Sequence, residues 1–190
     1  EVFSTIEAVD FNVGRTGALT PVAELKPVQV GGITISHASL HNYDEIQRLG
    51  VKIGDTVIVS RAGDVIPKII KVLKELRNGK EKEFKMPVRC PIDNSLVVKD
   101  KAIHRCSNKQ CGARLREQLY HFVSRPAFDI RGLGPKIIDR FLDEGLIRDA
   151  ADIFVLKKGD IAALERFGEK SADNLIKEIE QRKKIILPRF

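Results

Sequence analysis

The sequence predicts a multidomain α+β protein: a five-stranded β-barrel at residues 1–83, a small metal-binding knuckle at 84–116, and α-helical hairpins at 117–190. Three observations predict this organisation. Apolar and polar residues alternate between glycine turns in the first third of the chain. All the cysteines lie in one short segment, and a pattern of a glycine followed by an amphipathic helix occurs twice near the C-terminal end.

Composition places the chain among ordinary globular proteins, because 43% of its 190 residues are hydrophobic and 31% are charged. Its apolar runs are too short to cross a bilayer. The net charge of +7 is concentrated in one segment, since residues 85–125 hold 9 basic and 3 acidic residues. A local basic excess favours binding to a polyanion, although it is also compatible with a solvated surface. The first residue is Glu1, inside a strand-like pattern, so we expect the chain to be part of a longer protein.

The barrel is predicted from five strand-like stretches with one short helix between the third and the fourth. The first two stretches cover residues 5–13 and 18–30, and a turn at 14–17 joins them. The third covers 33–36, after Gly31-Gly32. The last two cover 57–59 and 65–73. Three strands, a helix and two strands are the order of an OB-fold, a barrel that often binds nucleic acids.

The predicted helix between the third and fourth strands has apolar residues at a spacing of three, from Leu40 to Leu49. Ser39 is a candidate N-cap, and Gly50 ends the pattern. Residues 74–83 are nearly all polar, and we expect them to form a hinge or an exposed loop.

The knuckle is a candidate metal site because two ligand pairs are joined by a short loop. Cys90 and Asp93 form the first pair, and Cys106 and Cys111 form the second. His104 competes with Asp93 for the fourth position, since neutral imidazole is a common zinc ligand. We expect a structural Zn²⁺ held by Cys90, Asp93, Cys106 and Cys111. The alternative is a metal-free knuckle in which the cysteines pack as small apolar residues.

The helical segment contains an internal repeat. Gly132-Leu133-Gly134-Pro135-Lys136 aligns with residues 166–170 at an offset of 34, so that Gly134 matches Gly168 and Lys136 matches Lys170. A glycine before a helix leaves backbone N–H groups free for a phosphate, and the helix dipole and a lysine add positive potential. This pattern predicts helix-hairpin-helix motifs that bind a duplex backbone without reading its sequence. The alternative is a pair of structural turns between helices.

No nucleophile with an adjacent base stands out, and no glycine-rich nucleotide-binding loop occurs. We therefore expect this part of the protein not to be catalytic by itself. Arg15 and Arg61 each lie beside a predicted glycine turn of the barrel. Val65 and Ile66, just after Arg61, would by pattern alone belong to the barrel core.

Several motifs together resemble the bacterial NAD-dependent DNA ligases. They are the segments at residues 13–23, 37–42, 61–67 and 121–125. The resemblance covers essentially the whole chain and implies the order barrel, zinc finger and helical hairpins. It also implies an enzyme that joins nicks by transferring AMP from NAD, with Mg²⁺, through a lysine in a Lys-x-Asp-Gly motif. That motif does not occur in this sequence, so the resemblance places the NAD site in an upstream adenylation domain.

The resemblance also assigns candidate DNA-binding residues. Arg15, Thr16 and Arg61 would contact the backbone near a nick, and Val65 and Ile66 would press into the minor groove. In the hairpins, the residues that would contact phosphates are Gly132, Gly134, Lys136, Gly168 and Lys170. The family pattern has four cysteines in the zinc finger and four hairpins, whereas this sequence has Asp93 at one cysteine position and two hairpins.

The resulting hypothesis is a DNA-binding fragment that clamps nicked double-stranded DNA in replication and repair. We expect a monomer with no membrane association, in the bacterial cytoplasm at the nucleoid. The alternative is a non-enzymatic scaffold for DNA repair or recombination. A single-strand binder is disfavoured because aromatic residues make up only 6% of the chain and Trp is missing.

Overall fold

The computed structural model describes residues 2–60, 67–165 and 167–184. The chain divides into two compact units, Glu1–Cys111 and Gly112–Phe190. Most of the knuckle, which the sequence predicts as a module of its own at 84–116, lies within the first unit, whose boundary falls after Cys111. Within the described residues, no helix has the length and apolar character needed to cross a membrane.

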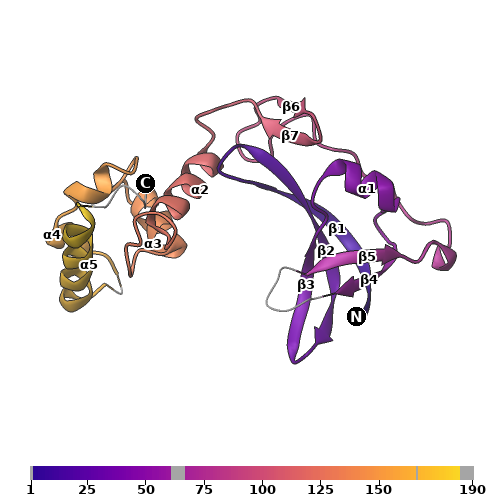
Figure 1. The fold of residues 1–190 in the computed structure, drawn as a ribbon, viewed down its shortest axis with the longest axis horizontal. Helices are drawn as coiled ribbons and strands as arrows, with labels where there is room; N and C mark the ends of the chain where they lie inside the picture. The colour runs from indigo at the N-terminus through magenta and orange to yellow at the C-terminus, as the bar shows by residue number, and fades with distance from the viewer. Residues whose placement is uncertain (1, 61–66, 166, 185–190) are drawn as a thin grey trace. The chain divides into compact units, whose positions relative to one another are not determined.

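The first unit contains a closed five-stranded barrel (Figure 1). Its strands are β1 (Val2–Val13), β2 (Ala18–Val30), β3 (Ile33–Ser39), β4 (Thr56–Ser60) and β5 (Lys68–Val72). They pair in the order β1-β4-β5-β3-β2, and a further β1–β2 pairing closes the ring. All these pairings are antiparallel except β3 with β5. The predicted OB-fold barrel is therefore confirmed.

Alternating residues of the strands fill the barrel. Ile6, Leu25, Val57 and Val59 are almost completely buried, as expected for side chains on the inner face of a pleated strand. Burial of each such side chain contributes about 1.5–3 kcal/mol. The register between β2 and β3 shifts between Glu24 and Val28. Pro27 lies in this irregular stretch, where a residue without a backbone N–H removes no hydrogen bond between the strands.

The helix between β3 and β4 is α1 (Tyr43–Leu49). Its N-cap is Asn42, whose side chain accepts a hydrogen bond from Glu45 N at 2.9 Å, so the predicted cap at Ser39 is wrong. Ser39 instead ends β3 and accepts a hydrogen bond from His41 N. Gly50 ends the helix in the left-handed conformation, with φ 67°, as its position in the sequence predicts.

Most residues of the polar segment 74–83 are exposed, which agrees with the exposed loop that its composition predicts, whereas contacts with the barrel argue against a hinge. It begins with a 3₁₀ turn at Lys74–Leu76, and Lys82 pairs with Ile53 in an isolated β-bridge. Arg77 reaches the buried side chain of Asp55 with two hydrogen bonds of 2.7 and 2.8 Å. The segment is therefore fastened to the barrel region by long-range contacts that local composition does not reveal, among them the Arg77–Asp55 pair and a Lys52–Glu83 ion pair of 3.3 Å.

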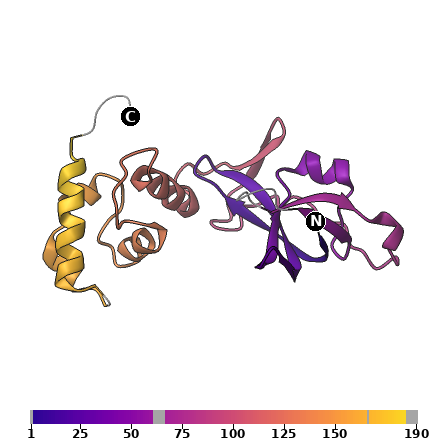
Figure 2. The ribbon, with the colours of Figure 1, turned by 60° about the horizontal axis from the view of Figure 1, so that its bottom comes forward.

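The knuckle carries a hairpin of β6 (Val97–Asp100) and β7 (Ile103–Cys106). Strand β7 pairs with the start of β2, so the hairpin extends the barrel sheet beside the turn that joins β1 and β2 (Figure 2). The edge-on contact between His104 and Tyr43, with ring centroids 5.8 Å apart, joins the same hairpin to α1.

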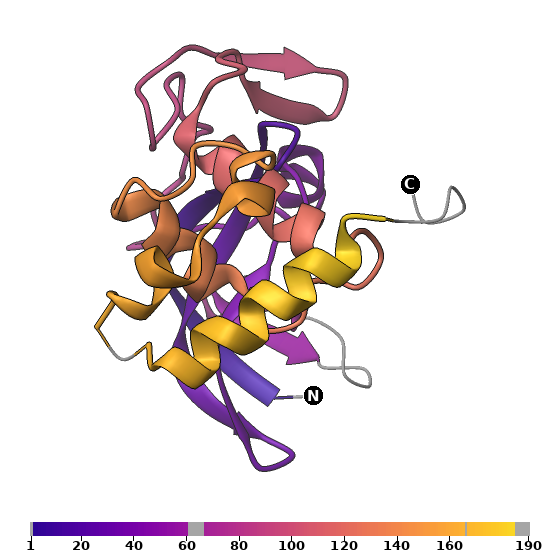
Figure 3. The same cartoon turned by 90° about the vertical axis from the view of Figure 1, so that its left-hand side faces the viewer.

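The second unit is helical and has its own apolar core (Figure 3). Its elements are α2 (Gly112–Val123), α3 (Pro135–Asp143), a 3₁₀ turn at Asp152–Val155, α4 (Lys158–Ala162) and α5 (Glu169–Arg182). Phe141, Ile153 and Ile161 are fully buried in this core. Helices α3 and α5 begin at equivalent points of the internal repeat, after Gly134 and Gly168, which confirms the predicted helical hairpins.

Candidate metal centre and nucleic-acid interface

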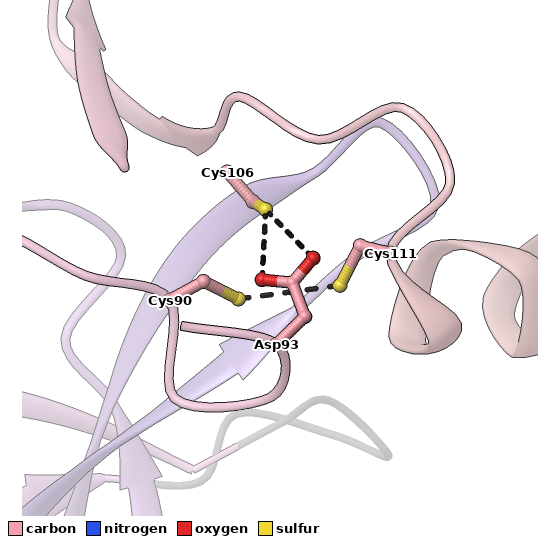
Figure 4. Close-up of side chains that lie close together, drawn as sticks. All are labelled: Cys90, Asp93, Cys106 and Cys111. Atoms are coloured by element: carbon pink, nitrogen blue, oxygen red, sulfur yellow. Dashed lines mark hydrogen bonds between the residues drawn. The ribbon is translucent and has the colours of Figure 1, made fainter. Parts of the chain in front are cut away.

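The knuckle brings together the four side chains that the spacing predicts as metal ligands (Figure 4). One ligand atom from each of Cys90, Asp93, Cys106 and Cys111 lies within 4.8 Å of the others. Cys90 and Asp93 come from one turn, Cys106 ends β7, and Cys111 immediately precedes α2. The three thiols are buried and none is in a disulfide.

The distances between these atoms fit a tetrahedral zinc ion. Zinc–sulfur bonds of about 2.3 Å at a tetrahedral centre separate two sulfurs by about 3.8 Å. The sulfurs of Cys90 and Cys111 are 4.0 Å apart, and the Cys106 sulfur lies 3.6 and 3.7 Å from the two Asp93 carboxylate oxygens. The donor set is therefore already collected around a space of the right size.

The charges of this donor set also favour a cation. Hydrogen bonds from the Ser95 backbone N–H and the Asn108 side chain keep the pKa of Asp93 far below its usual value, so it carries a negative charge. Burial raises the pKa of the Cys106 thiol to about 12. A thiolate at Cys106 thus requires a compensating positive charge, which a bound Zn²⁺ supplies.

His104, the competing ligand, does not join this cluster. Its ring packs edge-on against Tyr43, and burial lowers its pKa. The geometry therefore favours Asp93 as the fourth donor. Both alternatives lie near a cysteine in the sequence, and the packing of the hairpin against α1 keeps His104 out of the donor set.

The barrel presents Arg15 and Thr16 at the tip of the turn between β1 and β2. Both residues are exposed. Gly14 N and Gly17 N close the turn by donating to Ala18 O and Gly14 O, and Gly17 has φ 81°, a conformation that favours glycine. Of the barrel residues that the sequence predicts for DNA contact, Arg61, Val65 and Ile66 lie outside the described residues.

In the first hairpin, Gly134 is the N-cap of α3 and has extended backbone angles, φ −87° and ψ 174°. No side chain caps the helix, and a Cβ built at Gly134 would meet open space. The first-turn amides and the exposed Lys136 therefore face a site where an anion has room to approach. Gly132, two residues earlier, has φ 84° and shapes the turn itself.

The second hairpin repeats this geometry. Gly168 caps α5 with φ −85° and ψ 162°, again without a side-chain cap and with open space at its Cβ. Lys170 is exposed in the first turn of α5. Two helix N-termini in the same unit thus offer backbone donors and a lysine each.

Ion pairs hold the two helices of each hairpin together, and the sequence patterns described above do not predict them. In the first hairpin, Arg116 of α2 donates to Asp139 of α3 at 2.5 Å, and the Tyr120 hydroxyl donates to the same carboxylate. In the second, Lys158 of α4 lies 3.0 Å from Asp173 of α5. Asp139 and Asp173 occupy equivalent positions of the repeat. A carboxylate at both positions was the sequence signal that could have indicated these ion pairs.

Comparison with known proteins agrees with the two-part architecture. Residues 3–81 match the family described as the NAD-dependent DNA ligase OB-fold domain, and residues 125–181 match the SAM-like helix-hairpin-helix tandem. Similar proteins named DNA ligase occur in Coxiella burnetii (strain RSA 493), at 51% identity, and in Alcanivorax borkumensis and Nitrosococcus oceani, each at 50%.

Each of these comparisons covers 100% of this chain but only 29%, 25% and 29% of the respective relative. The chain therefore spans between a quarter and a third of the length of the curated relatives that it matches. The OB-fold match names the family directly, and the identity to DNA ligases extends through the knuckle and both hairpins. The chain belongs to the NAD-dependent DNA ligase family, in which it corresponds to the region with the OB-fold, the cysteine knuckle and the helix-hairpin-helix motifs.

Proposed function

We propose that this chain clamps nicked duplex DNA for the ligation reaction of an NAD-dependent DNA ligase. The observation that carries the proposal is the pair of helix N-termini at Gly134 and Gly168, each without a side-chain cap and with open space at its glycine. Backbone N–H groups at such positions bind phosphates irrespective of base sequence. A nick can occur in any sequence, so recognition through the backbone suits this task.

The barrel would act at the nick itself. Arg15 and Thr16 are exposed at one turn of an OB-fold, and an arginine and a hydroxyl are both donors to phosphate oxygens. We assign them to the backbone beside the break, together with Arg61. Val65 and Ile66 are assigned to the minor groove on the basis of the family resemblance.

The knuckle would contribute a structural Zn²⁺ held by Cys90, Asp93, Cys106 and Cys111. A closed set of four protein ligands leaves no open position for a reacting water, which is the arrangement of structural rather than catalytic zinc sites. NAD and Mg²⁺ would serve the whole enzyme, whose adenylated lysine lies in another domain. The contribution of this chain to catalysis is then the alignment of the 3′-hydroxyl and the 5′-phosphate.

The proposal is tested by fluorescence anisotropy with one labelled 30-mer, presented as nicked duplex, intact duplex and single strand at two salt concentrations. We expect both duplexes to bind more tightly than the single strand, with an affinity that falls steeply as salt rises. Preference for the single strand, or binding that ignores salt, would contradict the proposal and favour a scaffold that acts on another partner.

A pair of variants on one helix makes the test specific to the hairpins. Lys170→Gln removes the charge in the first turn of α5, whereas Lys177→Gln removes an exposed charge further along the same helix. We expect Lys170→Gln to weaken duplex binding about threefold to tenfold and to reduce the salt slope by about one. Lys177→Gln should leave both unchanged, and equal effects of the two variants would remove the assignment to the helix N-terminus.

A further inference from the structure

The turn with Arg15 and Thr16 is built partly by the knuckle. Strand β7 pairs with the start of β2, with Arg105 opposite Ala18 and His104 opposite Leu19. The backbone N–H of Cys106 also donates to Gly17 O at 2.9 Å. The C-terminal side of the turn is thus hydrogen-bonded to the strand that carries a candidate metal ligand.

Arg105 fastens the tip of the same turn. Its Nη1 donates to Thr16 Oγ1 at 2.8 Å and lies 3.4 Å from Thr16 O, while its Nε donates to Asp100 at 3.3 Å. The guanidinium is held at both ends, and only 29% of its side chain is exposed. The contacts of Arg105 with Thr16 join residues 89 positions apart in the sequence.

The direction of the hydrogen bond at Thr16 has a chemical consequence. Arg105 can only donate, so the Thr16 oxygen is the acceptor and the hydroxyl proton remains directed elsewhere. Thr16 is exposed, so its O–H is available to donate to an external acceptor such as a phosphate oxygen. The nearby guanidinium makes the hydroxyl a better donor by placing positive charge on its acceptor side.

We propose that Arg105 is a positioning residue that aligns the Arg15–Thr16 turn for the DNA backbone, and that closure of the metal centre at Cys106 holds Arg105 in place. This inference rests on the proposed function for its DNA-binding consequence. Its structural half, the coupling of the knuckle to the turn, stands independently. The knuckle is then a support for the DNA-contacting turn as well as a connection along the chain.

The structural half is tested without DNA, by hydrogen exchange of the backbone amides at residues 14–18 in the metal-loaded chain. Arg105→Gln and Thr16→Val break the same hydrogen bond from opposite sides, and we expect each to speed this exchange about tenfold. Arg89→Gln is the matched control, because Arg89 lies on the same knuckle and donates to Asn94 O instead. Removing the metal with a chelator should speed the exchange in the wild type and abolish the difference from Arg105→Gln.

The functional half is tested by a double-mutant cycle on affinity for nicked duplex. We expect Arg105→Gln and Thr16→Val each to weaken binding about fivefold, and the double variant to lose little more than either one. A melting curve for each variant separates this loss from unfolding, and Arg105→Lys, which keeps the charge, provides a milder second variant. Losses that multiply, to about 25-fold, would mean that Arg105 contacts DNA itself and would overturn the positioning role.

Failures of the two proposals are distinguishable. If the wild type does not bind nicked duplex, the proposed function fails, and the exchange measurement alone decides whether Arg105 holds the turn. If the wild type binds and Arg105→Gln changes neither exchange nor affinity, only the present inference fails.

Discussion

Replacement of Arg77 by Met should strongly destabilise the barrel, because Arg77 is the charged partner of a buried carboxylate. Arg77 makes a two-pronged pair with Asp55, at 2.7 and 2.8 Å, and also donates to Gly50 O at 2.6 Å. The side chain of Asp55 is 0% exposed. In the Arg77→Met variant this carboxylate keeps the hydrogen bond from Lys52 N but has lost its charged partner.

The expected magnitude follows from that burial. Breaking a buried ion pair by removing one partner costs about 3–5 kcal/mol, because an uncompensated charge remains in a medium of low polarity. With an m-value of about 1.5 kcal/mol per molar urea, the midpoint of barrel unfolding should fall by about 2–3 M. A urea titration followed by methyl NMR signals of Val57 and Val59, both buried in the barrel, measures this midpoint directly.

Arg48 supplies a control of the same chemistry in a different environment. It makes a two-pronged pair with Glu45 at 2.8 and 2.6 Å, but its side chain is 67% exposed. Arg48→Met should leave the unfolding midpoint almost unchanged, because solvent screens an exposed ion pair. Adding Asp55→Asn to Arg77→Met should recover part of the loss, since it removes the buried charge. Similar losses for Arg77→Met and Arg48→Met would refute the reasoning that burial sets the magnitude.

Four further outcomes are expected from the hairpins and the knuckle. Gly134→Ala should weaken duplex binding with little change in melting temperature, because φ −87° suits any residue and the added methyl group takes space needed by a phosphate. Gly132→Ala should instead lower the free energy of unfolding by about 1 kcal/mol, because φ 84° strains an alanine; anisotropy and thermal melts distinguish the two. Cys106→Ser should disorder the knuckle and abolish stoichiometric zinc, measured by metal analysis and NMR, and an unchanged spectrum would support the metal-free alternative. Asp93→Cys should raise zinc affinity in a chelator competition, because it completes a Cys₄ set of softer ligands.

The elements that the sequence predicts well are those specified by neighbouring residues. Alternation of apolar residues specified the strands, and Gly50 and the glycines of the hairpins specified where helices end and begin. The repeat also placed Gly134 and Gly168 correctly at the starts of α3 and α5. The metal-ligand candidates followed from spacing, since a tight turn brings positions three apart together.

A local signal failed at the cap of α1, where two chemically similar residues competed. Ser39 and Asn42 are both good N-caps, and the pairing of β3 through Ser39 leaves Asn42 as the cap. Asp93 and His104 are both zinc ligands by chemistry, and the packing of His104 on Tyr43 separates them. A polar composition predicted a hinge or an exposed loop at 74–83, and the segment is mostly exposed, but only the structure shows that Arg77 anchors it to Asp55.

By itself the sequence determined the kinds of element, their order, the cysteine-rich donor set and the repeated glycines, because each depends on residues that are close along the chain. Only the tertiary structure decided which distant residues meet: Arg105 with Thr16, Arg77 with Asp55, and Arg116 with Asp139. These pairs depend on the register of strand pairing and on the packing of helices. Both are set by burial of the whole core rather than by any local pattern.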